Sequence, residues 1–414
     1  MNGKKPQLRF AGFDDAWEQR ELKSIYQKIR NAFVGTATPY YVDDGHFYLE
    51  SNNVKNGQIN HNSEIFINDD FYEKQKENWL HTGDLVMVQS GHVGHTAVIP
   101  ENLDNTAAHA LIIIANPNEK ISSYFVNYEF QTPTAKNSID NITTGNTIKH
   151  ILASEMKKFR IQVPTYEEQE KVGNYFQQLD HLITLHQSKH DKLTNIKRSM
   201  LEKMFPKNGA DVPEIRFKGF SDAWEQRKLG TVGNFKNGMN FSKDAMGHGY
   251  AFVNLQNIFG KSVIDTEKLE LAEASETQLH EYNLQEGDVL FVRSSVKLEG
   301  VGETAIIPKT LENTTYSGFI IRFRDELGID KNYKRYVFST TEIRKQIMAQ
   351  ATNSANKNIS QPVLENLKIK FPINAEQKKI GEYFENLDKL IALQQCKLEK
   401  LKNIKKACME KMFV

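Results

Sequence analysis

Two groups of residues in this chain have types and spacings that could support metal chemistry. Asp140, Glu155 and Lys157 together offer two carboxylates and a lysine, as a metal-dependent nuclease would use them, because carboxylate oxygens hold divalent cations. His186 and His190 stand four residues apart, and two imidazoles at that spacing on one helix face can bind zinc. Each group is a hypothesis that the rest of the sequence must support.

The rest of the sequence does not complete any of these motifs. The chain repeats itself, and the repeat has Val363 and Glu365 where the first copy has Glu155 and Lys157. Gly260-Lys261-Ser262 has the end of a phosphate-binding loop, but Leu255 occupies the position of its first glycine. Asn116-Pro117-Asn118 departs from a methyltransferase catalytic run at its third residue. The sequence therefore predicts no metal, no cofactor and no catalytic site.

The chain is an internal duplication. Residues 6–22 match residues 213–229 at 12 of 17 positions, with a shift of 207. Residues 161–205 match residues 369–413 at 24 of 45 positions, with a shift of 208. We call these matching opening and closing segments the frame. A fixed period of this kind determines the architecture, so the chain should be one unit built twice.

Between the frame segments, the two inserts share a skeleton and differ in most residues. Each contains short apolar runs beside turn residues, a pattern typical of strands, with helical patches nearby, and this predicts an α+β module. The runs lie at 85–88, 110–114, 289–292 and 318–323. Divergent inserts on a matching frame predict two different surfaces on one scaffold, although neutral drift of the inserts is the alternative.

Each closing segment carries a heptad stripe without an internal proline, and Pro206 ends the first one. A helix with one apolar stripe must bury it. We expect the two helices to pair as an antiparallel coiled coil in a pseudo-twofold arrangement; packing on the chain's own module or on another protein are the alternatives. His186 and His190 fall on this stripe, which favours a packing role. The predicted coiled-coil residues are Val172, Leu179, Leu182, Ile183, Leu193, Ile196, Ile380, Leu387, Leu390, Ile391, Leu401 and Ile404.

The predicted domains follow from this pattern. Residues 1–163 and 207–371 should form two tandem α/β domains, and residues 164–206 and 372–414 should form the two helices. The net charge is +1, so composition neither indicates nor excludes a polyanionic partner. The chain has no apolar run of membrane-spanning length and only two cysteines, Cys396 and Cys408, which predicts a reduced, cytoplasmic protein.

With this layout, the chain resembles the DNA specificity subunit of type I restriction-modification systems. The resemblance rests on the repeated openings at 13–20 (FDDAWEQR) and 220–227 (FSDAWEQR). It also rests on the closing segments, which share a proline (Pro164 and Pro372), a Glu-Gln pair and a Leu-Asp pair. Two copies at this spacing, each enclosing a divergent insert, make the resemblance specific, and it covers the whole length.

The resemblance implies a non-catalytic protein that binds double-stranded DNA with a bipartite target. Each insert would be a target-recognition domain that reads one half of the target, and the helices would set the unread gap. Methyltransferase subunits, two of them, would dock on the helical region, and a restriction motor-nuclease subunit would join them. A stand-alone bivalent DNA-binding or scaffold protein without a methyltransferase partner is the alternative.

Under that resemblance, polar loop residues become candidate DNA contacts, because Arg and Lys suit guanine or phosphate and Asn and Gln suit adenine. Thr144 and Thr352, and Lys149 and Lys357, coincide at the 208 shift, which favours phosphate contact. Gln89 and Arg293 follow equivalent strands with different neighbours, as base readers would. The candidates are Gln89, Ser90, His92, Lys136, Asn137, Thr144, Asn146, Lys149, Lys236, Asn237, Asn240, Lys243, Arg293, Ser294, Lys297, Thr352, Asn353, Asn356 and Lys357. For the candidates at 136–149 and 352–357, a capped polar loop is the alternative explanation.

Overall fold

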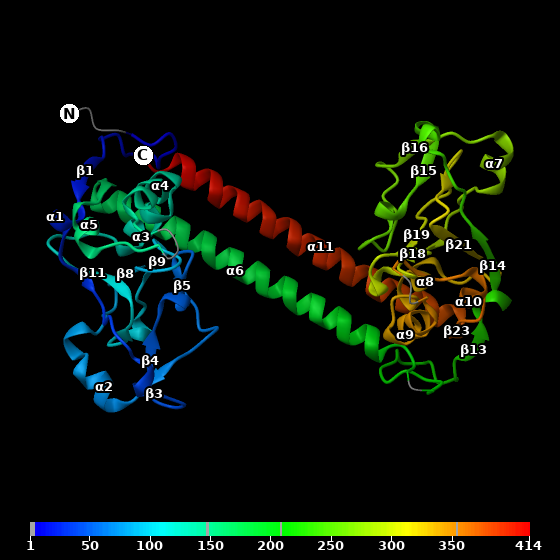
Figure 1. Ribbon diagram of the computed structural model, residues 1–414, viewed down its shortest axis with the longest axis horizontal. Coiled ribbons are helices and arrows are strands. Elements are labelled where there is room, and N and C mark those ends of the chain that lie inside the picture. The colour runs from blue at the N-terminus through cyan, green and yellow to red at the C-terminus, as the bar shows by residue number, and fades with distance from the viewer. Residues whose placement is uncertain (1–4, 146–148, 208, 353–354) are drawn as a thin grey trace. The chain divides into compact units, whose positions relative to one another are not determined.

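The structure is a computed structural model that describes residues 5–145, 149–207, 209–352 and 355–414 (Figure 1). The chain divides into two compact units. Unit 1 comprises residues 1–187 and 396–414, and unit 2 comprises residues 188–395. Among the described helices, none has both the length and the hydrophobicity of a membrane-spanning segment.

The main sheet of unit 1 is antiparallel, with strand order β2-β11-β8-β9. One face packs on helices through Leu85 and Met87, and the other packs on a second sheet through Val86 and Val88. Burial on both faces explains why these strands are apolar runs without polar alternation. The strands are β2 (Tyr26–Asn31), β11 (Leu111–Pro117), β8 (Leu85–Val88) and β9 (Thr96–Val98).

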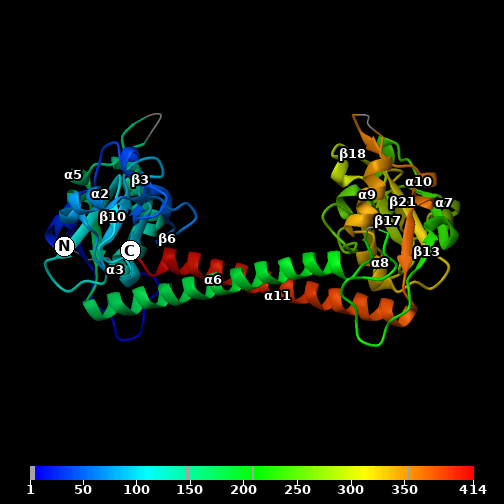
Figure 2. The same cartoon turned by 90° about the horizontal axis from the view of Figure 1, so that it is seen from below.

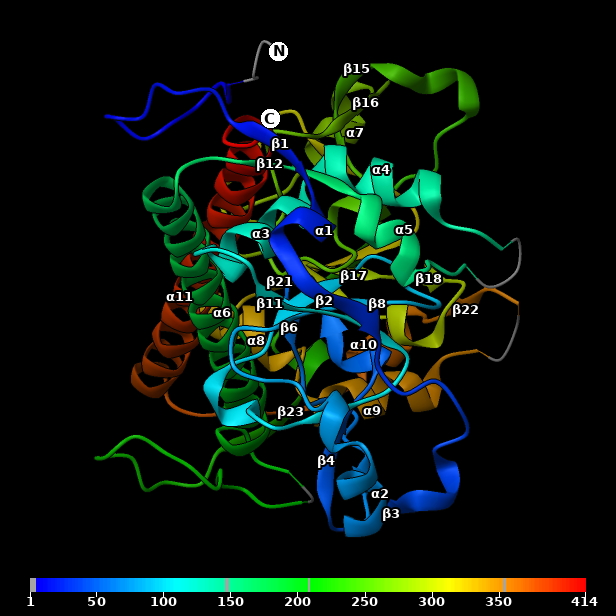
Figure 3. The ribbon, with the colours of Figure 1, turned by 90° about the vertical axis from the view of Figure 1, so that its left-hand side faces the viewer.

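Smaller elements flank this sheet on two sides (Figure 3). On one side lie the helices α3 (Ser123–Gln131), α4 (Pro133–Ile142) and α5 (Ala153–Lys158). On the other side lie helix α2 (Asp69–Lys74) and a sheet of order β10-β4-β7-β3 (Ala107–Ala108, His46–Leu49, Phe66–Ile67 and Tyr41–Val42). The remaining elements are β1 (Glu18–Glu21), which pairs with β12 (Arg160–Val163), helix α1 (Leu22–Ile25), and a hairpin of β5 (Val54–Lys55) and β6 (Gln58–Ile59).

Unit 2 has the same main topology, as the duplication predicts. Its main sheet has the order β14-β21-β17-β19 (Gly233–Asn237, Ile320–Asp325, Val289–Val292 and Thr304–Ile306). Strand β13 (Glu225–Lys228) pairs with β23 (Lys368–Phe371), as β1 pairs with β12. The helices are α7 (Glu276–Glu281), α8 (Lys331–Val337), α9 (Thr341–Gln350) and α10 (Gln361–Glu365). A second sheet has the order β16-β15-β20 (Glu270–Ala272, Met246–Val253 and Thr315–Tyr316), and β18 (Ser294–Ser295) pairs with β22 (Lys357–Asn358).

The two long helices are α6 (Tyr166–Lys203) and α11 (Asn374–Lys411), so both continue through both units. Within unit 1, Tyr175 and Asp180 of α6 contact Cys408 and Lys405 of α11, and this reversed order makes the helices antiparallel there. Within unit 2, Lys197 likewise pairs with Asp388, and Phe205, just past the end of α6, lies against Phe384.

The predicted coiled-coil residues differ in their exposure. Val172, Leu179, Ile380 and Leu387 are buried. Leu182, Leu390 and Ile404 are exposed, and the remaining five, Ile183, Leu193, Ile196, Ile391 and Leu401, are partly exposed. Each buried position lies near the start of its helix, where the helix also packs on its module. The domain boundaries after residues 163, 206 and 371 remain a proposal.

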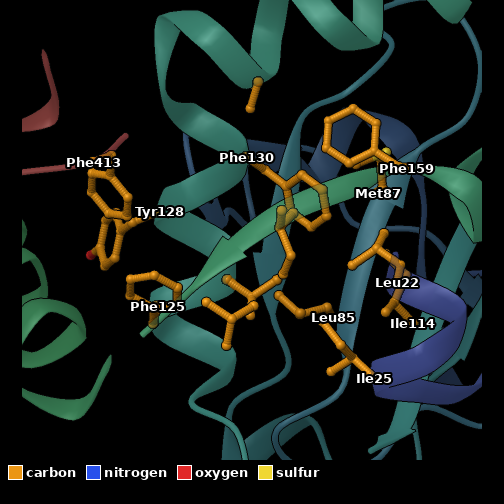
Figure 4. Close-up of a cluster of buried hydrophobic side chains, with 14 of the residues drawn as sticks. Leu22, Ile25, Leu85, Met87, Ile114, Phe125, Tyr128, Phe130, Phe159 and Phe413 are labelled. Atoms are coloured by element: carbon orange, nitrogen blue, oxygen red, sulfur yellow. The ribbon is translucent and has the colours of Figure 1, made fainter. Parts of the chain in front are cut away.

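The end of each long helix completes the core of the unit in which it ends. Phe413 lies beside Phe125 and Tyr128 of unit 1 (Figure 4) and contacts Trp17 edge to face, with 6.1 Å between ring centroids. In unit 2, Phe205 contacts Trp224 in the same way, at 6.0 Å. The matching Met-Phe pairs that end the two frame copies are therefore core residues.

Buried ion pairs attach the opening segments to the starts of the long helices. Arg9 donates two hydrogen bonds to Glu168 at 2.6 and 2.7 Å, and Arg216 donates two to Glu376, both at 2.8 Å. Both carboxylates are buried. The backbone N–H of Leu8 also donates to the carbonyl of Lys411, at the end of α11. The opening segment thus binds the start of one long helix and the end of the other.

Candidate nucleic-acid interface

In unit 1, two of the predicted clusters lie side by side on paired backbone. Ser90 forms a β-bridge with His150, which also bridges Thr144. Next to these bridges, the N–H of Gly91 donates to the carbonyl of Lys149 at 3.1 Å, and the N–H of Ile151 donates to that of Gln89 at 3.0 Å. Residues about 60 positions apart in sequence therefore share one surface.

Unit 2 builds the same backbone arrangement from different residues. Ser294 pairs with Asn358 and Ser295 with Lys357 in the β18–β22 ladder. The N–H of Ile359 donates to the carbonyl of Arg293 at 2.9 Å, as Ile151 does to Gln89. Figure 2 shows β18 at the end of unit 2 away from α11. The two units thus present equivalent surfaces with different side chains.

The surface of unit 1 is rich in cationic and imidazole groups. The loop that carries His92 and His95 packs on α4, where a Cβ on Gly94 would lie 2.8 Å from Ile139. Burial lowers the pKa of His95, and His92 and the charges of Lys136 and Lys55 lower it further. The positive charges of Lys136 and Lys55 would favour the approach of an anion such as phosphate.

The loops of unit 2 are longer than those of unit 1. Seven residues (89–95) join β8 to β9, whereas eleven residues (293–303) join β17 to β19. The N–H of Ala110 donates to the carbonyl of Phe33 in unit 1, and the N–H of Gly318 donates equivalently to the carbonyl of Met239 in unit 2. The next strand begins one residue after Ala110, at Leu111, but two residues after Gly318, at Ile320. Phe319 is therefore an extra residue of unit 2.

The two additions meet at an open cavity of about 530 Å³ in unit 2. Phe319 is 56% exposed there and Val296 is 77% exposed, which is unusual for large apolar side chains. Ser294, Ser295, Lys297 and Asn356 also line the cavity. Apolar groups among hydrogen-bonding groups can contact both the methyl group and the polar edges of base pairs.

The third predicted cluster separates into two parts. Asn240 lies against Gly318, whose carbonyl accepts a hydrogen bond from the Arg293 guanidinium at 3.3 Å, so Asn240 belongs to the same surface. The Lys236 ammonium instead forms an ion pair with Glu281 at 3.5 Å and lies over the ring of Tyr282. Asn237 ends β14, and Lys243 is exposed in a short 3-10 helix.

The other candidates are mostly exposed. Lys136 and Asn137 lie on α4, and Thr144, Lys149, Lys297, Thr352 and Asn356 lie in loops or strand ends. Lys149 forms an ion pair with Asp140 at 3.5 Å. The side-chain oxygen of Gln89 is buried without a hydrogen-bond partner in the described structure. Asn146 and Asn353 lie outside the described residues.

The metal-site hypotheses gain no support from the structure. Over the described ranges, no three His, Cys, Asp or Glu residues group closely enough to hold a metal ion. Glu155 forms an ion pair with Lys158, and Asp140 forms one with Lys149. His190 lies 3.2 Å from the carboxylate of its neighbour Asp191. Local ion pairs of this kind are common on solvated helix surfaces.

Comparison with known proteins identifies the family. The model of the type I restriction modification DNA specificity domain matches this chain twice, over residues 14–195 and 221–403. The chain belongs to this family. Each match covers one insert with most of its following helix, so the duplication seen in the sequence is a duplication of the family's domain.

Individual members of the family are similar over most of this chain. The EcoKI specificity subunit of Escherichia coli K12 is 21% identical over 362 residues, covering 85% of this chain and 77% of that protein. The MjaVIII specificity subunit of Methanocaldococcus jannaschii is 24% identical, covering 64% of each. The crystal structure of a type I S subunit from M. genitalium has a TM-score of 0.58 at 13% identity and covers 99% of both chains, so the fold is shared.

Several surface residues of unit 1 were missed by the sequence interpretation. Lys55 lies on a two-residue strand that has no clear sequence signal. Lys402 and Lys406 lie on α11, where a heptad analysis treats charged residues as solvated flanks. A comparison of the two frame copies would have found Lys402, because its counterpart 208 residues earlier is Thr194.

Proposed function

We propose that this chain is the DNA-recognition subunit of a type I restriction-modification complex, in which each unit reads one half of a bipartite target. The observation that carries this proposal is the pair of surfaces around Gln89 and Arg293. Their backbones pair in the same way, while their side chains differ in type and loop length. Equivalent backbones suit equivalent positions on two half-sites, and different side chains suit different bases.

In this proposal, α6 and α11 hold the two units apart and set the length of the unread gap. Each helix has 38 residues, or about 57 Å at 1.5 Å per residue. The chain itself is non-catalytic, and methylation and cleavage belong to partner subunits in the cytoplasm. The functional domains would be 1–163 and 207–371 for recognition, with 164–206 and 372–414 as spacer helices.

The deciding experiment is modified-base sequencing of the host genome with this gene intact and deleted. We expect a motif of two fixed parts and an unread gap to lose its methylation when the gene is deleted. Unchanged methylation, in cells that express the chain, would contradict the proposal. Co-purification would then distinguish a DNA-binding scaffold, which binds DNA and retains no methyltransferase.

The helices also offer two equivalent faces for partner subunits. Leu182 and Leu185 are exposed on α6, and Leu390 and Leu393 are exposed at the corresponding positions of α11. Exposed leucine pairs cost solubility unless a partner covers them. We propose that each pair binds one methyltransferase subunit, so that a complex contains two, and that a motor-nuclease subunit joins this assembly.

This stoichiometry can be tested with aspartate substitutions. Leu185→Asp should reduce the co-purified methyltransferase from two copies per chain to one, Leu393→Asp should do the same, and the double variant should retain none. Native mass spectrometry measures the copies. Glu167→Gln, on an exposed turn at the start of α6, is the control that keeps both copies. Two copies retained by the double variant would place docking elsewhere.

A further inference from the structure

A second cavity lies in unit 1, where both long helices meet the recognition module. Its volume is about 540 Å³. Its walls come from the β5–β6 hairpin, from α4 and the end of α3, and from both helices. Four lysines line it: Lys136, Lys402, Lys405 and Lys406. No part of the recognition surface described above includes the three lysines of α11.

The wall formed by the hairpin is fixed in place. The Asn127 side chain donates a hydrogen bond of 2.9 Å to the carbonyl of Gly57, at the turn of the hairpin. Gly57 has a φ of +84° and lies so close to Gln131 that a Cβ there would overlap the side-chain amide. Asn56 and Gln58, on either side of this glycine, line the cavity. The cavity is therefore preformed and has hydrogen-bond donors on one wall.

The charges in the cavity are unbalanced. Lys405 is neutralised by Asp180, with 2.6 Å between the ammonium and the carboxylate, and Glu410 contributes one further negative charge. Lys402 and Lys406 are exposed and have no ion-pair partner within the described part of the chain. With Lys136, three cations face one remaining carboxylate. An anion is the ligand that such a surface would attract.

The corresponding region of unit 2 shows which of these charges the fold needs. Lys405 corresponds to Lys197, which pairs with Asp388 as Lys405 pairs with Asp180, so this pair belongs to the frame. Lys402 corresponds to Thr194, whose hydroxyl donates to the carbonyl of His190. Lys136 corresponds to Arg344, which is partly buried and donates to the carbonyl of Glu299. Lys406 corresponds to Arg198, which is exposed and donates to the side-chain oxygen of Asn195. The frame therefore keeps a cation at the position of Lys406, whereas the free cations Lys402 and Lys136 are additions of unit 1.

The cavity is continuous with the recognition surface of unit 1. Asn56 lines the cavity and its N–H donates to the imidazole of His95 at 3.4 Å. Lys136 also lines the cavity, and its charge acts on His95 together with that of Lys55. A surface with Lys55, Lys136, Lys402 and Lys406 as its cations thus runs from beside the loop of His92 and His95 across α4 to the last turns of α11.

We infer that this cavity binds the phosphate backbone of DNA in the unread gap next to the half-site read by unit 1. The inference rests on the proposed function, because a duplex held at His92 and His95 would continue over Lys136 toward Lys402 and Lys406. These lysines contribute affinity without sequence information, as phosphate contacts do. Because unit 2 keeps only Arg198 of the three free cations, the contact is stronger on the unit 1 side of the gap.

The test uses the chain together with the methyltransferase subunits that co-purify with it. The variant is Lys402→Thr with Lys406→Ala, and threonine at position 402 reproduces the residue of unit 2. The control is Lys397→Ala with Lys400→Ala, which removes two exposed lysines of the same helix that do not line the cavity. Binding is titrated over salt concentration with a duplex that carries the bipartite target and with one whose half-sites are scrambled.

We expect the variant to reduce the slope of log K against log salt by about 1.8, at about 0.9 per phosphate contact, equally on both duplexes. The control should keep the wild-type slope. Phosphate-ethylation interference should show wild-type contacts in the gap beside the unit 1 half-site that the variant loses, and weaker contacts beside the other half-site that the variant leaves unchanged.

An unchanged slope in the variant would overturn the inference and leave the proposed function intact. If the variant kept the wild-type slope of log K against log salt but lost the methyltransferase subunits, the cavity would be a protein-docking surface and the inference would be overturned. If the wild-type complex bound neither duplex, the proposed function would itself fail. Thermal unfolding of both variants at the wild-type temperature would confirm that these results do not come from misfolding.

Discussion

The buried carboxyl of Glu129 distinguishes the core of unit 1 from that of unit 2. Glu129 on α3 accepts a hydrogen bond of 3.1 Å from the backbone N–H of Gln162, and its second oxygen is buried without a partner in the described structure. Complete burial raises the pKa of Glu129 to about 8, and the hydrogen bond only partly opposes this. The counterpart in unit 2 is Val337, so the frame does not require an ionisable group here.

We therefore predict that Glu129 makes the stability of the protein depend on pH. The folded pKa lies above the ordinary value of 4.5, so the folded chain keeps a proton that the unfolded chain loses. Its contribution is fully present below about pH 4.5 and is lost as the pH rises through about 8, by at most about 1.4 kcal/mol per pH unit. Glu129→Gln should remove this dependence in denaturant unfolding, whereas the exposed control Glu167→Gln should keep it. If the free energy of unfolding changed with pH equally in the wild type and in Glu129→Gln, Glu129 would not be the source of the pH dependence.

For single residues, the sequence predicts which positions of the two units are equivalent better than it predicts side-chain contacts. The equivalence of Gln89 and Arg293 was visible because both follow an unmistakable apolar strand, and the structure places both beside a second predicted cluster. The ion pair of Lys236 with Glu281 was not visible, because it joins segments with no shared pattern. Phe319 was assigned to a strand, since an extra residue before a strand changes neither composition nor periodicity.

At the scale of elements, the end of each long helix acts as a core segment. Phe413 is buried against Trp17 and Phe125, far from it in sequence. Phe413→Ala should cost about 3–5 kcal/mol in the free energy of unfolding of unit 1, as is usual for a buried phenylalanine. Hydrogen exchange read by mass spectrometry should then rise in β8 and β11 and stay unchanged in β17 and β21.

The matched variant Phe205→Ala should have the reverse effect, because Phe205 fills the corresponding place beside Trp224 in unit 2. Exchange should rise in β17 and β21 alone. If either variant raised exchange equally in both units, the helix ends would not act as separate core segments. Together the two variants test whether each helix end stabilises only the unit in which that helix ends.

The long helices were the elements that the sequence predicted most fully. A stripe over five heptads and flanking prolines place α6 and α11 within a few residues of their observed ends. The exposure of Leu182 and Leu390 could not be predicted, because a heptad pattern identifies apolar positions and not the surface that covers them. The small sheets of two-residue strands were missed for a related reason, since their pairing depends on tertiary contacts.

At the scale of the whole molecule, the proposed function treats the helix pair as a ruler. Duplicating residues 181–187 in α6 and residues 389–395 in α11 adds one heptad to each helix. Seven residues make nearly two turns, so the apolar stripe stays in phase while each helix grows by about 10 Å. This is the length of about three base pairs at 3.4 Å each.

The lengthened protein should therefore methylate targets whose gap is about three base pairs longer than the native gap. Its efficiency should be lower, because three base pairs also rotate one half-site about the duplex axis by roughly a third of a turn. Sequencing of a plasmid library with graded gap lengths measures the preference directly. The control duplicates the heptad in α6 alone, which mismatches the helix pair and should abolish methylation at every gap. If the doubly lengthened protein folds and still prefers the native gap, the helices do not set the spacing of the half-sites.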